Sequence, residues 1–133
     1  MIKFTNANAI MIGDFYRNYG YPYIDIANGG SLKGMLEGLD ATMQLAGPDT
    51  RLVPGHGTII KRDDIVPYRD MIFAVQGKVQ ELIAAGKSLQ DVLAAKVTAP
   101  FDAKVPGGLQ PAGTGTSADR FVAAVYRELK GGG

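Results

Sequence analysis

Two short apolar runs open the chain, at residues 2–5 and 9–12, and the segment Asn6-Ala7-Asn8 separates them. This spacing predicts a β-hairpin. The second run, Ala9-Ile10-Met11-Ile12, is apolar at every position and does not alternate. A strand that is apolar on both sides is normally covered on both faces of its sheet. We therefore expect this strand to need cover on two sides.

Helical periodicity dominates the rest of the chain, with apolar residues at alternating spacings of three and four. Helices are predicted at residues 31–46, 63–86, 88–93 and 117–129. Ser31 and Ser117 are the expected N-caps of the first and last helix. Ser88 and Asp91 resemble a capping box at the start of the short one.

A third strand is predicted at residues 51–53. Residues 15–30 are expected to form an aromatic-rich loop, and residues 96–116 to be irregular. The element order is then strand, strand, helix, strand, helix, helix, helix, in one domain spanning residues 1–133. A small sheet with helices is an α/β or α+β architecture. One helical layer covers only one face of a sheet, so the strand at residues 9–12 still lacks cover on the other.

The apolar faces of these elements predict the core. We expect nine side chains to be buried: Ile10, Ile12, Leu36, Leu39, Val53, Ile72, Val75, Phe121 and Val125. Two further features leave alternatives open. The tyrosines of the 15–23 segment either line a pocket or pack over the core. Gly29-Gly30 either cradles an anion at a helix N-terminus or is a flexible lead into the N-cap.

Composition limits the functions open to the chain. It has 133 residues, a formal net charge of +1 and no basic cluster larger than the pair Lys61-Arg62, which argues against a nucleic-acid partner. There are no cysteines, which excludes disulfides, thiolate zinc sites and a cysteine nucleophile. No stretch approaches a membrane span, and the first residues lack a signal-peptide run. We expect a cytoplasmic protein with no membrane partner.

Two residues stand where strands are predicted to end. The single histidine, His56, lies in the segment Pro54-Gly55-His56-Gly57 after the third strand, and Asp14 follows the second strand in the same way. Imidazole nitrogen and carboxylate oxygen both bind zinc, and a strand end holds a side chain firmly beside an open loop. The alternative is that His56 occupies an ordinary strand-to-loop turn and Asp14 is a turn or capping residue.

Five segments together resemble the metallo-β-lactamase superfamily, most closely its general hydrolase branch. They are Asn8-Ala9-Ile10-Met11-Ile12-Gly13-Asp14, Tyr21-Pro22-Tyr23-Ile24-Asp25, Gly29-Gly30-Ser31, Val53-Pro54-Gly55-His56-Gly57 and Tyr68-Arg69-Asp70-Met71. The likeness covers nearly the whole chain, but only the C-terminal half of the family fold, which is a four-layer αββα sandwich of two similar halves. It implies half of that sandwich: a small mixed sheet covered by helices on one face.

The resemblance also implies roles for two residues. Asp14 matches the aspartate that bridges or ligates the metals, and His56 matches a histidine ligand of the second metal. The family's His-x-His-x-Asp-His motif and a further histidine belong to the half that this chain lacks, and the chain has one histidine in total. Two ligands fall short of the three that a catalytic zinc normally has. A zinc site of Asp14 and His56 is therefore incomplete, and is either vestigial or shared across a dimer.

Two functional hypotheses follow. The first is a half-domain without catalytic activity of its own that self-associates through its sheet. The second is a zinc-dependent hydrolase whose site is completed by a second chain, either another copy or a separate N-terminal half-domain. The sheet face left without its other half favours a homodimer, unless residues 96–116 fold back and cover that face.

Overall fold

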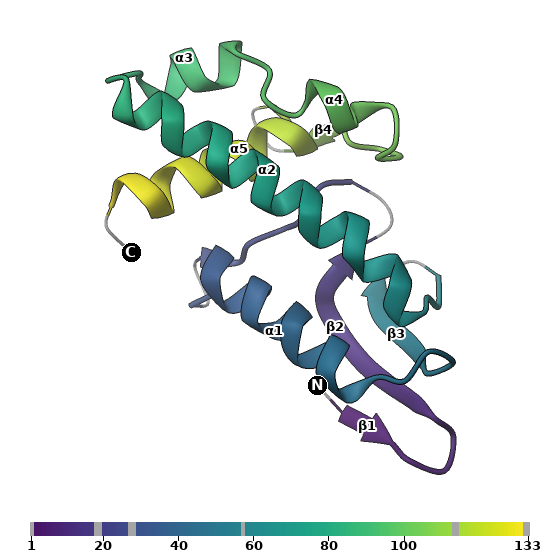
Figure 1. The fold of residues 1–133 in the computed structure, drawn as a ribbon. Coiled ribbons are helices and arrows are strands. Elements are labelled where there is room, and N and C mark those ends of the chain that lie inside the picture. The colour runs from purple at the N-terminus through teal and green to yellow at the C-terminus, as the bar shows by residue number, and fades with distance from the viewer. Residues whose placement is uncertain (1, 18–19, 27–28, 57, 113–114, 132–133) are drawn as a thin grey trace.

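Three strands form a mixed sheet at one end of the molecule (Figure 1). The computed structural model describes residues 2–17, 20–26, 29–56, 58–112 and 115–131. Strand β1 (Ile2–Phe4) pairs antiparallel with β2 (Ala9–Arg17), and β2 pairs parallel with β3 (Arg51–His56). The predicted hairpin and the mixed α/β fold are confirmed.

Strand β2 is longer than the sequence indicated. Residues 15–17 were expected in a loop, but β2 runs on to Arg17 and pairs there with His56. The register shifts on either side of Gly13, which has a φ of +59°. A left-handed glycine of this kind accommodates a β-bulge, so the strand bends and continues instead of ending.

Strand β3 also passes the point where Pro54-Gly55 was expected to end it. Proline removes a backbone donor, which a central strand cannot tolerate. β3 lies at the edge of the three-stranded sheet, and among the described residues an isolated bridge from Leu52 to Ile60 is its one further pairing. The proline is therefore accommodated, and His56 is the last residue of the strand.

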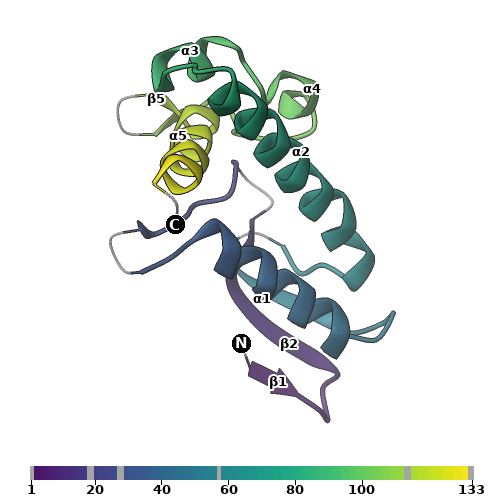
Figure 2. The same cartoon turned by 60° about the vertical axis from the view of Figure 1, so that its left-hand side comes forward.

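Two long helices pack on the sheet. Helix α1 (Leu32–Leu45) lies along β2 (Figure 2), and Ser31 caps it as predicted by accepting a hydrogen bond from the Gly34 N–H. Helix α2 (Ile65–Ala84) follows the 3₁₀ turn η2 (Arg62–Asp64). A 2.6 Å contact between the Arg69 guanidinium and the Asp40 carboxylate joins the two helices. Among the described residues, no helix is both long and apolar enough to span a membrane.

The C-terminal third gathers at the far end of α2 (Figure 1). Helix α3 (Leu89–Ala94) begins with the predicted capping box of Ser88 and Asp91. The segment expected to be irregular contains the short helix α4 (Ala99–Asp102) and the small hairpin of β4 (Pro111–Ala112) and β5 (Gly115–Thr116). Helix α5 (Ser117–Lys130) then returns across α2.

The cap of α5 is Thr116, and the prediction of Ser117 is wrong by one residue. Thr116 and Asp119 form a complete capping box, with hydrogen bonds of 3.1 Å in both directions. The Ser117 hydroxyl is buried and instead accepts the Tyr21 backbone N–H at 2.8 Å. A long-range partner thus uses the serine oxygen that the local pattern assigned to the helix.

Tyr21 ties the aromatic segment to the C-terminal third. Its ring is fully buried and stacks on Phe121 with centroids 5.9 Å apart. Its hydroxyl donates to the Asp102 carboxylate at 2.5 Å and lies 3.3 Å from the Thr98 carbonyl oxygen. Burial, together with that carboxylate, raises the pKa of Tyr21 well above its ordinary range, so the hydroxyl stays a donor. Tyr21 therefore belongs to the core.

Eight of the nine predicted core side chains are buried. Val53 is the exception, because it is only partly buried. It pairs with Met11 in the parallel ladder, so the two side chains share a sheet face. Ile10, Ile12 and Leu52 point to the opposite face, beneath α1 and α2, and are 0–2% exposed. The prediction for Val53 failed because a short apolar strand does not reveal which face will be covered.

Val75→Asp is expected to destabilise the fold by at least about 3 kcal/mol, because it places an unpaired charge in the core. Val75 is 1% exposed on the inner side of α2. Phe73→Asp is the matched control, since Phe73 lies two residues away and is 47% exposed. Urea unfolding followed by circular dichroism measures both. Equal stability of Val75→Asp and the parent would show that the assigned helix face is wrong.

Candidate functional site

The predicted metal-binding positions lie on neighbouring parallel strands. The backbone of Asp14 belongs to β2 and that of His56 to β3. The prediction that Asp14 follows the strand is wrong, because β2 continues for three residues beyond it to Arg17, whereas His56 is the last residue of β3. Gly13 pairs with Pro54 and Arg17 with His56, so both residues lie in the second half of their strands. Carboxyl ends of parallel strands meet at the same edge of a sheet. The topology thus brings the two positions to one edge.

The side chains of Asp14 and His56 lie outside the part of the chain that the structure describes. Within the described residues, no group of three or more histidine, cysteine, aspartate or glutamate side chains is placed to hold a metal. The assignment of Asp14 and His56 as ligands stays a prediction. A catalytic zinc would need at least one more protein ligand than these two residues supply.

The N-terminus of α1 is already occupied by a carboxylate of the same chain. Glu128, near the end of α5, accepts the N–H groups of Leu32 at 2.7 Å and Lys33 at 3.2 Å. The Ser31 hydroxyl takes the next one, from Gly34, at 2.9 Å. An acidic side chain at this position complements the helix dipole. A free anion would have to displace Glu128 to bind here.

The glycines before α1 have structural reasons of their own. Gly29 has a φ of +87°, which side chains rarely adopt. A Cβ on Gly30 would lie 2.8 Å from the Asp25 carbonyl oxygen. Of the two interpretations of this segment, the structure favours the lead into the N-cap over the anion cradle.

The sheet face opposite the helices is open to solvent and largely apolar, although the exposed Arg51, which pairs with Ala9, also lies on it. Ile2 is 58%, Phe4 47% and Met11 46% exposed, and the partly buried Val53 lies beside them. The pairing of Ile2 with Met11 and of Met11 with Val53 places these side chains on one surface. We call this surface the outer sheet face. Soluble monomers rarely expose contiguous apolar patches larger than a few hundred Å² unless they bind something.

Residues 96–116 do not cover the outer sheet face with any of their described residues. They pack at the other end of the molecule, against α2, α5 and Tyr21 (Figures 1 and 2). The Thr98 and Asp102 contacts with Tyr21 hold the start of the segment there. Hydrogen bonds from Ser117 to Gln110 and from Ala118 to Gly108 hold its end. The alternative in which this segment folds back over the sheet is therefore not realised.

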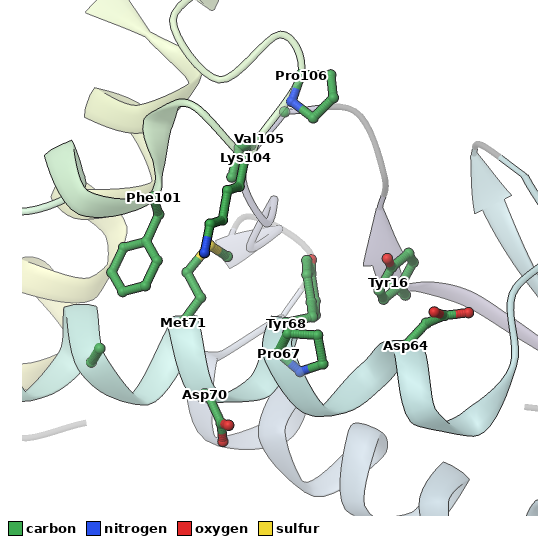
Figure 3. Close-up of a pocket in the computed structure, with 12 residues that line it drawn as sticks. Tyr16, Asp64, Pro67, Tyr68, Asp70, Met71, Phe101, Lys104, Val105 and Pro106 are labelled. Carbon is green, nitrogen blue, oxygen red and sulfur yellow. The ribbon is translucent and has the colours of Figure 1, made fainter.

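A cavity of about 690 Å³ opens on the helical side of the molecule (Figure 3). Three parts of the chain surround it: Tyr16 near the end of β2 with Gly20 after it, the start and first half of α2, and Phe101 of α4 with the segment that follows. Its α2 wall includes Tyr68 and Met71, both buried. Of the tyrosines in the 15–23 segment, Tyr16 lines this cavity. Tyr23 is exposed and carries the Arg120 guanidinium 4.6 Å from its ring centroid, and Tyr19 lies outside the described residues.

Sequence patterns indicated only a small part of this cavity. Tyr68 and Met71 belong to the apolar face of α2 and carry the same signal as core residues. Residues 101–106 form the other wall. They were expected to be irregular, and their sequence did not indicate that they would pack opposite α2. Only the concentration of aromatic residues after β2 pointed to a pocket.

Searches against models of protein families, curated proteins and solved structures found no match to this chain.

Glu128→Gln is expected to lower stability by about 1–2 kcal/mol, because it removes the charge that two N–H groups of α1 share. Glu37→Gln, on the exposed side of α1, is the matched control and should change stability by less than about 0.5 kcal/mol. Urea unfolding at neutral pH compares the two. An equal loss of stability in Glu128→Gln and Glu37→Gln would contradict a specific role for Glu128 at the N-terminus of α1.

Proposed function

We propose that this chain is a metallo-β-lactamase-like half-domain that associates with a second copy through the outer sheet face and has no catalytic activity on its own. The exposed Ile2, Phe4 and Met11 on a face without helices carry the proposal. In the αββα sandwich that the sequence resembles, the corresponding face packs on the sheet of the other half. The two halves of that sandwich are similar, so an identical chain has a suitable shape to replace the absent one.

The contact would be isologous, which is the commonest symmetry of oligomers. Strand spacing and rise give the three-stranded face an area of roughly 250 Å². Stable interfaces bury about 800 Å² on each partner. The face alone is therefore small, and we expect a dimer in the micromolar range that exchanges readily with monomer.

A zinc-dependent hydrolase completed by a second chain is the second candidate. One observation favours it: β2 and β3 bring the backbones of Asp14 and His56 to the same edge of the sheet. A sheet-on-sheet dimer could bring two copies of each residue towards one edge, which offers up to four ligands. A separate N-terminal half-domain would instead supply the ligand motif that this chain lacks. Zinc bound there would activate a water molecule as nucleophile.

Sedimentation velocity at micromolar and higher loading tests the dimer. The parent should show a monomer–dimer equilibrium, and Met11→Asp should shift it to monomer, because the charge would be buried in the contact. Phe73→Asp replaces an apolar side chain of similar exposure on α2 and should leave the equilibrium unchanged. A parent that stays monomeric at every concentration would contradict the proposal.

The isolated chain is expected to show no zinc-dependent hydrolysis of lactams, esters, thioesters or phosphodiesters. Zinc per chain after purification without added metal, and turnover of these substrates, are the measurements. Asp14→Ala and His56→Ala are the diagnostic variants, and Asp63→Ala is a control at an exposed carboxylate. The second candidate would be established instead by turnover that survives repurification, is lost in Asp14→Ala and in His56→Ala, and is retained in Asp63→Ala.

A further inference from the structure

The cavity beside α2 is independent of the outer sheet face. It lies on the side of the sheet that the helices cover, so dimerisation through the outer face would leave it open. Its volume of about 690 Å³ falls in the range of small-molecule sites, roughly 300–1,000 Å³. Its lining is mainly apolar and aromatic, as in such sites: Tyr16, Pro67, Tyr68, Met71, Phe101 and Val105.

Contacts on both sides hold the walls in place. The rings of Tyr16 and Tyr68 lie with their centroids 4.5 Å apart at an angle of 45°. On the other side, the Gly20 N–H donates to the Pro106 carbonyl oxygen at 2.6 Å. The bond between Asp102 and Tyr21 fixes α4, which carries Phe101. A cavity whose walls are already ordered loses less entropy on binding a ligand than one that must form around it.

The charges around the cavity are separated. Figure 3 shows Lys104 extending along the cavity towards Met71, whereas Asp70 points to the opposite side of α2. Asp64 lies at the far end beside Tyr16, and its carboxylate accepts the Lys61 N–H at 2.9 Å. None of the ion pairs between described residues involves Lys104. Lys104 is thus the cationic side chain that lines the cavity between Phe101 and Met71, whereas the two lining carboxylates, Asp64 and Asp70, lie away from it.

From this arrangement we propose that the cavity binds a small amphipathic carboxylate. The carboxylate pairs with Lys104, and the apolar body lies against Phe101, Met71 and Tyr68. An ammonium and a carboxylate form a charge-assisted hydrogen bond, and the apolar walls favour a hydrocarbon or aromatic body over a polar one. Binding of such a ligand requires neither a metal nor a second chain.

Octanoate is the probe, and octanol and octyltrimethylammonium are its neutral and cationic counterparts. Titration calorimetry and saturation-transfer NMR on the full chain should show saturable octanoate binding at one site per chain, tighter than either counterpart. Lys104→Met keeps the apolar stem but removes the charge. It should weaken octanoate binding about tenfold and leave octanol binding unchanged, whereas Lys104→Arg should retain octanoate binding.

Two further variants separate the cavity from the rest of the surface. Lys87→Met removes an exposed lysine that does not line the cavity, and should leave octanoate binding unchanged. Ala74→Leu adds bulk to the cavity wall and should weaken octanoate and octanol alike. The proposal is overturned if the parent shows no saturable octanoate binding, if octyltrimethylammonium binds more tightly, or if Lys87→Met and Lys104→Met have equal effects.

Discussion

The structure depends on a sheet that one layer of helices can cover on only one side. Ile10, Ile12 and Leu52 are buried beneath α1 and α2, and this contact brings the strands and the long helices into one core. Side chains of a strand alternate between faces, so burial of this set forces Met11 and Val53 to the other face. The same alternation that builds the core therefore produces the apolar outer sheet face.

The second organising contact is Tyr21, which belongs to the same buried core. Its hydroxyl reaches Asp102 and its ring stacks on Phe121, so one side chain joins the segment after β2 to α4 and α5. The hydrogen bond to Asp102 and the stacking on Phe121 hold residues 96–112 away from the outer sheet face. They also place Phe101 and Lys104 opposite α2, which creates the cavity. The Tyr21 contacts thus help to shape the cavity and keep this segment off the outer sheet face.

The two surfaces differ in chemistry, and for this reason we propose different partners for them. The outer sheet face is an apolar sheet surface and matches another sheet in shape. The cavity is concave and lined with aromatic rings, and its available charge is an ammonium, which suits a small acid. The candidate metal positions form a third feature at the carboxyl ends of β2 and β3. Their proximity follows from the parallel pairing of those strands and not from any local sequence signal.

Local patterns in the sequence determined most of the secondary structure. The spacing of apolar residues predicted α1, α2 and α5, and Ser31 and the Ser88–Asp91 pair marked two helix starts correctly. These predictions are correct because helix periodicity and capping depend on neighbours within about one turn of the helix. Six of the eight correct core predictions lie in helices and follow from the same periodicity, whereas Ile10 and Ile12 follow from the continuous apolar run of β2. The identities of Asp14 and His56 as candidate ligands also came from the sequence.

Only the tertiary structure decided the features that depend on distant residues. The bulge at Gly13 extends β2 because β3 is beside it, and Ser117 leaves the capping role to Thr116 because Tyr21 occupies its hydroxyl. Glu128 reaches the first turn of α1 across 96 positions of sequence. The exposure of Val53 and the cavity walls likewise follow from which elements pack together. No local pattern contains that information, because it is set by the free energy of contacts between segments far apart in the chain.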